Sequence, residues 1–181
     1  MKIIIESLSK DKHKRLSFAC GEESLDRFLH TSAHQSHAKN MSKTFVAVYE
    51  DDETVILGYY TVTTIRLDPG ELSPAVTKAY SLPNSRDIPG SLVAKLAVSE
   101  HVKGQRVGQL MLMDAMARCA RVSREIGGVA IVVDALKEDV VSYYLQFGFQ
   151  RFEPTSLKLF IMMDTVDELL RPIADAAQRF G

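Results

Sequence analysis

The stretch Lys95–Leu110, which reads KLAVSEHVKGQRVGQL, constrains the fold more than any other part of the chain. An apolar run that ends in a glycine-containing loop and leads into a helix is typical of a strand–loop–helix unit in an α/β protein. The free backbone N–H groups at such a helix start, together with the helix dipole, attract an anion. The stretch therefore predicts a phosphate-binding loop, although glycines so spaced also serve ordinary turns.

The remaining sequence predicts further strands and helices around this unit. Two runs rich in β-branched and aromatic residues flank an acidic turn and predict an antiparallel hairpin. Four prolines between residues 68 and 90, Pro89 among them, indicate a loop-rich connection with a short helix near 75–80. We expect one α/β domain with a mixed central sheet flanked by helices. The predicted strands are 3–5, 43–50, 54–67, 91–98, 128–135 and 157–163, and the predicted helices lie within 17–30, 31–42, 107–124 and 137–146.

The segment 164–181 is expected to be a helical extension. Pro172 should kink or break this helix, because proline removes a backbone donor. The extension packs either on the same domain or on a partner. The apolar residues spaced for one helical face are Val166, Leu169, Leu170, Ile173 and Ala174.

Composition excludes several classes of protein. The 181 residues have a net charge of −1, so the chain lacks the bulk charge of a general nucleic-acid or membrane binder. Two cysteines give neither a disulfide framework nor a zinc site, and His34 and His37 would supply at most two ligands, so we expect no metal. No apolar run approaches the roughly 18 residues of a membrane span, and the N-terminus is unlike a signal peptide. We therefore expect a cytoplasmic protein. We also expect that the chain does not bind DNA by itself, since no recognition helix is visible.

Two segments together resemble the GNAT superfamily of acyl-coenzyme A dependent N-acetyltransferases, over residues 1–163. The first is the loop Lys103–Gly108, KGQRVG, and the second is the helix end Tyr143–Phe149, YYLQFGF. The resemblance implies acetyl-CoA as co-substrate, with the pyrophosphate held by the loop and the pantetheine arm held by backbone groups of the preceding strand. Arg106 stands where the family prefers glycine, so either the backbone needs no positive φ there or the loop is adjusted. The implied coenzyme-binding residues are Leu96, Ala97, Val98, Lys103, Gly104, Arg106, Val107 and Gly108.

The same resemblance implies Tyr144 as the general acid. A phenol with an ordinary pKa of about 10 can protonate the leaving thiolate, whereas the alternative is a tyrosine that only packs in the core. Tyr143 occupies a slot that usually holds an apolar packing aromatic. The substrate amine attacks the thioester directly, so no nucleophilic residue is needed, and both cysteines are expected to be small buried side chains.

A further set of residues resembles the GNAT branch that serves as toxins in type II toxin–antitoxin pairs. The matching stretches are Cys20–Leu29, His34–Lys43, Thr44–Val46 and Gly58–Thr61. The resemblance implies acetylation of the amino group of aminoacyl-tRNA, which blocks translation. It also implies neutralisation by a ribbon-helix-helix antitoxin, and a homodimer is expected.

The charge distribution permits a local contact with tRNA. Residues 1–43 hold eight Lys and Arg against five acidic residues, and four of the five histidines. Such an asymmetry favours phosphate binding, but a solvated charged surface explains it nearly as well. The candidate tRNA contacts are Lys12, Lys14, Arg15, His34, Lys39 and Lys43, with Lys103 as a further phosphate contact.

Two alternative functions stay open on the sequence. One is a GNAT enzyme that acetylates a protein N-terminus, a lysine or a small amine. The other is a non-catalytic acyl-CoA-binding module, for which Arg106 in the loop is the one argument.

Overall fold

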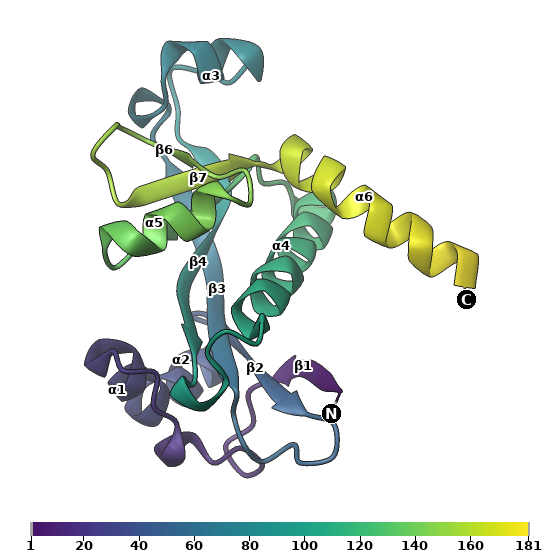
Figure 1. The fold of residues 1–181 in the computed structure, drawn as a ribbon. Coiled ribbons are helices and arrows are strands. Elements are labelled where there is room, and N and C mark those ends of the chain that lie inside the picture. The colour runs from purple at the N-terminus through teal and green to yellow at the C-terminus, as the bar shows by residue number, and fades with distance from the viewer. Residues whose placement is uncertain (1, 181) are drawn as a thin grey trace. The chain divides into compact units, whose positions relative to one another are not determined.

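The computed structural model describes residues 2–180, and along residues 173–180 it describes only the course of a helix. Seven strands form one sheet in the order β1-β2-β3-β4-β5-β7-β6, and helices flank it (Figure 1). The expected α/β domain with a mixed sheet is confirmed. The strands are β1 Ile3–Ser7, β2 Lys43–Tyr49, β3 Gly58–Leu67, β4 Ile88–Val98, β5 Ala130–Asp134, β6 Gln150–Arg151 and β7 Lys158–Met162. The helices are α1 Glu23–Thr31, α2 Ala33–Ala38, α3 Pro74–Ala79, α4 Val107–Ile126, α5 Glu138–Leu145 and α6 Met163–Phe180.

The chain divides into two compact units, of which the first contains the residues up to Thr63 together with Val93–Ala115. Strands β1, β2 and β3 pair antiparallel there, so the predicted hairpin is confirmed. Helices α1 and α2 pack an apolar face onto these strands. The buried cluster that results contains Leu8, Phe18, Cys20, Leu25, Leu29, Ala33, Val46, Val48, Ile56, Tyr59 and Ala97.

The second unit contains Thr64–Leu92 and the residues from Met116 onward. Strands β5 and β7 pair antiparallel, with Val132 opposite Phe160, and the two-residue strand β6 pairs with β7. Side chains from the loop-rich connection and α3 cover one face of these strands. The buried cluster on that face contains Leu67, Leu72, Ile88, Ala130, Val132, Phe160 and Met162.

The connection before β4 is shorter than the sequence predicts. Pro89 was expected in a loop, whereas the structure starts β4 at Ile88 and includes Pro89. Proline is tolerated at the beginning of a strand, where a missing N–H disrupts the ladder least. Its carbonyl still accepts a hydrogen bond from the Val129 N–H at 2.9 Å. The helix expected over residues 31–42 is also shorter, since α2 covers only Ala33–Ala38.

Helix α6 follows β7 directly and continues through Pro172. The predicted break at Pro172 is therefore wrong, because one proline removes a single intrahelical donor and the turns on either side continue. Val166 is fully buried and Leu169 is partly exposed, while the side chains of Ile173 and Ala174 lie outside the described residues. Among the helices described, none combines the length and the apolar character that spanning a membrane requires.

Candidate active site

The predicted phosphate loop has the geometry of an anion site at a helix start. A short 3-10 helix, Glu100–Val102, leads into the loop, and Gly104 adopts a left-handed φ of 81°. The first intrahelical hydrogen bond of α4 runs from the Leu110 N–H to the Arg106 carbonyl at 3.0 Å. The backbone N–H groups of Val107, Gly108 and Gln109 precede that bond, so they have no helical acceptor and are available to an anion.

The backbone of Arg106 is left-handed, although its residue type is not glycine. Its φ is 61°, so the loop keeps the left-handed backbone for which the family prefers glycine. The alternative in which the backbone needs no positive φ is therefore wrong. A non-glycine residue in this region is strained by roughly 1–2 kcal/mol. The Arg106 side chain is exposed, which leaves its guanidinium accessible to a ligand.

We expect Arg106→Gly to raise the free energy of unfolding by about 1 kcal/mol, because glycine relieves the left-handed strain. If the guanidinium also binds a coenzyme phosphate, the same change weakens coenzyme A binding several-fold by removing a charge-assisted hydrogen bond. Arg106→Asn is the matched control, since asparagine tolerates positive φ but carries no charge. Denaturant titration and calorimetry measure the two effects. Tighter coenzyme binding by the glycine variant would contradict a ligand role.

The end of β4, which is predicted to hold the pantetheine arm, is tightly packed in the first unit. Ala97 is buried, whereas Leu96 and Val98 are half-buried. The Ser99 N–H donates to the Leu57 carbonyl at 2.8 Å, which fixes the strand end against the segment before β3. The backbone of this strand end is thus held rigidly next to the loop that follows it.

The N-terminal segment also packs onto the loop. A Cβ built on Gly21 would lie 2.8 Å from Glu100 Oε1 and 3.5 Å from Lys103 Nζ. The Glu100 N–H donates to the Ala19 carbonyl at 3.0 Å, and the Lys103 ammonium lies 3.9 Å from the Glu100 carboxylate. The side chain of Lys103 remains more than half exposed, so it can still reach a phosphate.

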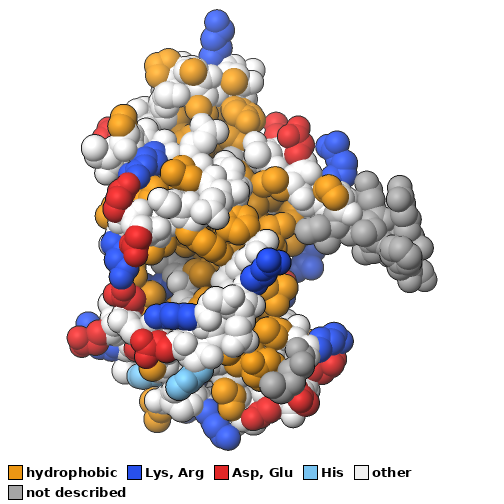
Figure 2. All heavy atoms as spheres, viewed as in Figure 1, with side chains coloured by type: hydrophobic (Ala, Val, Ile, Leu, Met, Phe, Trp, Pro, Cys, Tyr) orange, Lys and Arg blue, Asp and Glu red, His pale blue; other side chains and the backbone are white. Residues whose placement is uncertain are grey.

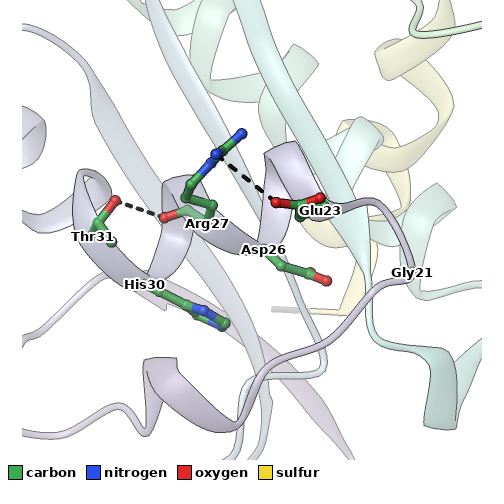
Figure 3. A pocket seen from close by; sticks show the side chains of 6 residues that line it. All are labelled: Gly21, Glu23, Asp26, Arg27, His30 and Thr31. Carbon is green, nitrogen blue, oxygen red and sulfur yellow. Dashed lines mark hydrogen bonds and ion pairs between the residues drawn. The ribbon is translucent and has the colours of Figure 1, made fainter.

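A hollow of about 440 Å³ adjoins this segment on the surface of α1 (Figure 3). Sequence reasoning did not propose a site at these residues, although polar side chains at i, i+3, i+4 and i+7 on α1 indicate one shared face. Within it the Arg27 guanidinium lies 3.9 Å from the Glu23 carboxylate. The residues that line the hollow are Gly21, Glu23, Asp26, Arg27, His30 and Thr31, none of them a predicted site residue.

Tyr144 lies on α5 in the second unit and is buried. Its ring contacts those of Tyr143 and Phe149, each with a centroid distance of 5.5 Å. Burial raises the pKa of the Tyr144 phenol well above its usual value, and the neighbouring Tyr143 and Asp134 raise it further. The phenol therefore holds its proton throughout the physiological range. Gly148 ends this region with a φ of 85°, and the buried Phe149 follows it as predicted.

The predicted tRNA contacts differ in how free they are. Lys12 is bound to the carboxylates of Glu6 and Glu53, and Arg15 donates to the His30 carbonyl at 3.1 Å. The side chains of three other lysines are exposed, and one of these, Lys43, also donates to the His37 carbonyl at 3.3 Å. Figure 2 shows cationic and acidic side chains interspersed on the face that it draws. The exposed members are Lys14, Lys39 and Lys43, and His34 is half-buried.

Both cysteines are buried, as expected, and neither forms a disulfide. Burial raises the pKa of Cys20 and of Cys119 to about 11. A thiol with such a pKa is almost wholly protonated at neutral pH and is a poor nucleophile. This agrees with a reaction that forms no covalent enzyme intermediate.

Known proteins resemble the chain along nearly all of its length. No protein-family model matches it. A Mycobacterium tuberculosis protein named tRNA-acetylating toxin is 29% identical over 155 residues, which are 85% of this chain and 89% of the relative. A Sinorhizobium fredii protein named Probable toxin TacT is 25% identical over 176 residues, which are 93% of this chain and 96% of the relative.

Solved structures give the same result. A tyrosine-to-phenylalanine mutant of KacT superimposes with a TM-score of 0.86 and 26% identity, covering 93% of this chain and 99% of KacT. AtaT complexed with acetyl-methionyl-tRNAfMet superimposes with a TM-score of 0.84 and 25% identity, with the same coverage. The chain therefore has the GNAT fold. It is similar over most of its length to two proteins named as toxins, one of them a tRNA-acetylating toxin.

Proposed function

We propose that the chain is an acetyl-CoA dependent N-acetyltransferase toxin that acetylates the amino group of aminoacyl-tRNA and so blocks translation. One observation carries this proposal: the chain aligns almost end to end with a tRNA-acetylating toxin and with AtaT complexed with acetyl-methionyl-tRNAfMet. Its own phosphate loop and the buried Tyr144 supply the chemistry that such a reaction requires.

The proposed reaction forms no covalent bond to the enzyme, so the main task of the protein is to bind and orient the two substrates. The neutral α-amine attacks the thioester carbonyl carbon, the new C–N bond forms, and the tetrahedral intermediate then breaks its C–S bond. An α-amine with a pKa near 8 is partly neutral at physiological pH, so the amine proton can pass to water. The N–H groups at the start of α4, with Lys103 and Arg106, would bind the coenzyme pyrophosphate. The backbone of Leu96–Val98 would align the arm.

Tyr144 would supply the proton at the leaving group. Its raised pKa keeps the phenol protonated, so a donor is present in every turnover. A thiol is a stronger acid than this phenol, because an ordinary thiol has a pKa of about 8.5. Complete proton transfer from the phenol to the thiolate is therefore uphill. A hydrogen bond that strengthens as charge develops on sulfur is the favourable form of this assistance.

The proposal includes the partners of such a toxin. Neighbouring toxin structures contain an antitoxin, and we propose a ribbon-helix-helix antitoxin for this chain and a toxin homodimer. DNA would be contacted through the antitoxin, because no recognition helix is visible in the sequence of this chain. The reaction would take place in the cytoplasm, where charged tRNA is found.

We also propose that residues 1–163 form the acetyltransferase domain and residues 164–181 a helical extension. The beginning of this extension packs on its own unit, since Val166 is buried and Arg124 donates to Asp167 at 2.5 Å. Arg171 and Pro172, on a following turn, are exposed and are the described part of α6 open to a partner.

Transfer of label from acetyl-coenzyme A to total charged tRNA tests the proposed function directly, with uncharged tRNA as the control. Label on charged tRNA alone is the expected result, and the labelled species identify the amino acid. Coenzyme binding without such label would overturn the tRNA proposal and favour a protein N-terminus, a lysine or a small amine as acceptor. Binding without any acetyl transfer to these acceptors would favour a non-catalytic module.

Removal of an exposed lysine should change how strongly salt weakens tRNA binding. For Lys14→Ala or Lys39→Ala, we expect the slope of log affinity against log salt to fall by about 0.7–0.9, because each lysine that contacts a phosphate releases one counterion. Lys2→Ala is the matched control, since Lys2 is exposed but bound to Glu50 at 2.7 Å. An unchanged slope in the first two variants would remove these residues from the interface.

A further inference from the structure

A groove of about 840 Å³ lies within the second unit, between the last turns of α4, the end of β3 and the beginning of β4. None of the residues that line it takes part in the proposed reaction. Two of them are exposed apolar side chains of α4, since Val122 is 43% and Ile126 is 72% exposed. Apolar side chains exposed together beside a groove are typical of a surface that binds another protein.

The end of β3 that lines this groove is also a strand edge. β2 begins at Lys43, which pairs with Val62, so β3 continues past β2 as far as Leu67. The sheet order places β3 between β2 and β4, and β4 lies on the other side of β3. Among the described residues, no strand therefore pairs with the outer side of Thr64–Leu67. An edge of this kind can pair with a strand of another chain.

Opposite charges lie together in the groove. The Arg66 guanidinium is bound to the Asp87 carboxylate, and both residues line the groove and are exposed. Exposed ion pairs contribute little to stability, so each of these groups can exchange its partner for an equivalent one. A surface that carries both a cation and an anion can be complementary to itself when a two-fold axis relates two copies.

The competing occupant is an acidic segment of another protein, because Arg86 adds a second exposed cation to the groove. An acidic segment would place like charge against Asp87. A second copy of the chain instead offers Asp87 a guanidinium and offers Arg66 a carboxylate. The charges of the groove therefore favour a second copy.

We propose that this groove binds a second copy of the chain, edge to edge along β3, and that Arg66 pairs with Asp87 of the partner subunit. A two-fold axis makes the two β3 strands antiparallel and repeats every contact. The exposed Val122 and Ile126 of both copies become covered. The inference deepens the proposed homodimer by naming its interface, and it rests on that homodimer but on no step of the proposed reaction.

Sedimentation velocity over a concentration series of the full chain tests the charge pair. We expect the wild type to form a dimer, and Arg66→Asp and Asp87→Arg each to raise its dissociation constant about 100-fold. Each change opposes like charges at both symmetric contacts, at about tenfold for each contact. An equimolar mixture of the two variants should dimerise about as tightly as the wild type. In that mixture the introduced carboxylate meets the introduced guanidinium, and the two native groups meet as well.

Ile126→Lys tests the apolar part of the groove. We expect it to weaken dimerisation at least about tenfold, because it places a charge in a contact that excludes water. Leu16→Lys is the matched control, since Leu16 is 78% exposed and lies outside the groove. Lys2→Glu is the control for charge reversal, since Lys2 is exposed and bound to Glu50 at 2.7 Å. Both controls should dimerise like the wild type.

Each other outcome overturns the inference. Unchanged dimerisation of Arg66→Asp and Ile126→Lys would place the dimer interface on another face. Failure of the mixed variants to recover would show that their losses arise within each copy. A wild type that stays monomeric would overturn the proposed homodimer as well, and would leave the groove to an acidic segment of another protein. Acetyl transfer to charged tRNA is a separate measurement, so its absence with an intact dimer would overturn the proposed reaction alone.

Discussion

Tyr144→Phe is expected to lower acetyl transfer to charged tRNA by about 100- to 1,000-fold, in the range that removal of one hydrogen-bond donor to a developing anion costs. The change removes only the phenolic oxygen. The ring remains, with its contacts to Tyr143 and Phe149, so the fold of α5 should be unaffected. Thiolate departure then has no protonated partner at the sulfur, and kcat should fall while the affinity for coenzyme A stays close to that of the wild type.

Three measurements together decide this prediction: single-turnover transfer, coenzyme A calorimetry and denaturant unfolding. A variant with normal binding and stability but retained kcat would assign Tyr144 to packing alone. The pH dependence provides an independent check. Burial raises the pKa of this phenol, so the wild type should show no loss of activity on the alkaline side, up to about pH 10, that ionisation of Tyr144 could cause.

Most of the fold follows from local patterns in the sequence. Continuous β-branched runs mark β2, β3 and β5, and glycines with positive φ end α4 and α5 where the sequence places them. Elements that depend on tertiary contacts escaped prediction. The two-residue strand β6 exists only because β7 pairs with it, and Pro89 joins β4 because the neighbouring segment donates to its carbonyl.

The candidate site was predictable to a similar extent. The proposed phosphate loop and Tyr144 lie in short contiguous motifs, so residue types and spacing are enough to propose them, and their roles stay predictions. The sequence does not show which cationic side chains form ion pairs with acidic side chains in the fold. Lys12 looks like any other lysine in the sequence, yet the fold brings Glu6 and Glu53 to its ammonium group. The hollow on α1 was missed because its polar residues resemble an ordinary solvated helix face.

The residues that resemble the toxin branch turn out to contact one another within the first unit. The Tyr59 hydroxyl donates to the Leu25 carbonyl at 2.8 Å, and the hydroxyl oxygens of Thr44 and Thr61 lie 3.1 Å apart in a buried position. The resemblance in this region therefore reflects how α1, β2 and β3 pack, in addition to any contact with a substrate. Gly58, in the same group, shows this most directly.

Gly58→Ala is expected to lower the free energy of unfolding by about 3 kcal/mol, the upper part of the usual range for overpacking a core. A Cβ at this position would lie 2.6 Å from Met111 Cε and 2.8 Å from the Ala97 carbonyl oxygen. Met111 is fully buried and has little room to move, and the carbonyl belongs to the strand backbone. The strand end must therefore shift. Since Ala97 lies where the coenzyme arm is expected, coenzyme A affinity should fall as well.

Gly127→Ala is the matched control for this effect. Gly127 adopts a φ of 90°, and a Cβ there would meet no described atom within 4 Å, so its replacement measures left-handed strain without a clash. That strain should lower stability by roughly 1 kcal/mol and leave coenzyme binding unchanged. Denaturant titration and calorimetry compare the two variants. If Gly58→Ala proved as stable as Gly127→Ala and bound coenzyme A normally, the close packing of Gly58 on Ala97 could not be what fixes the strand end for the coenzyme.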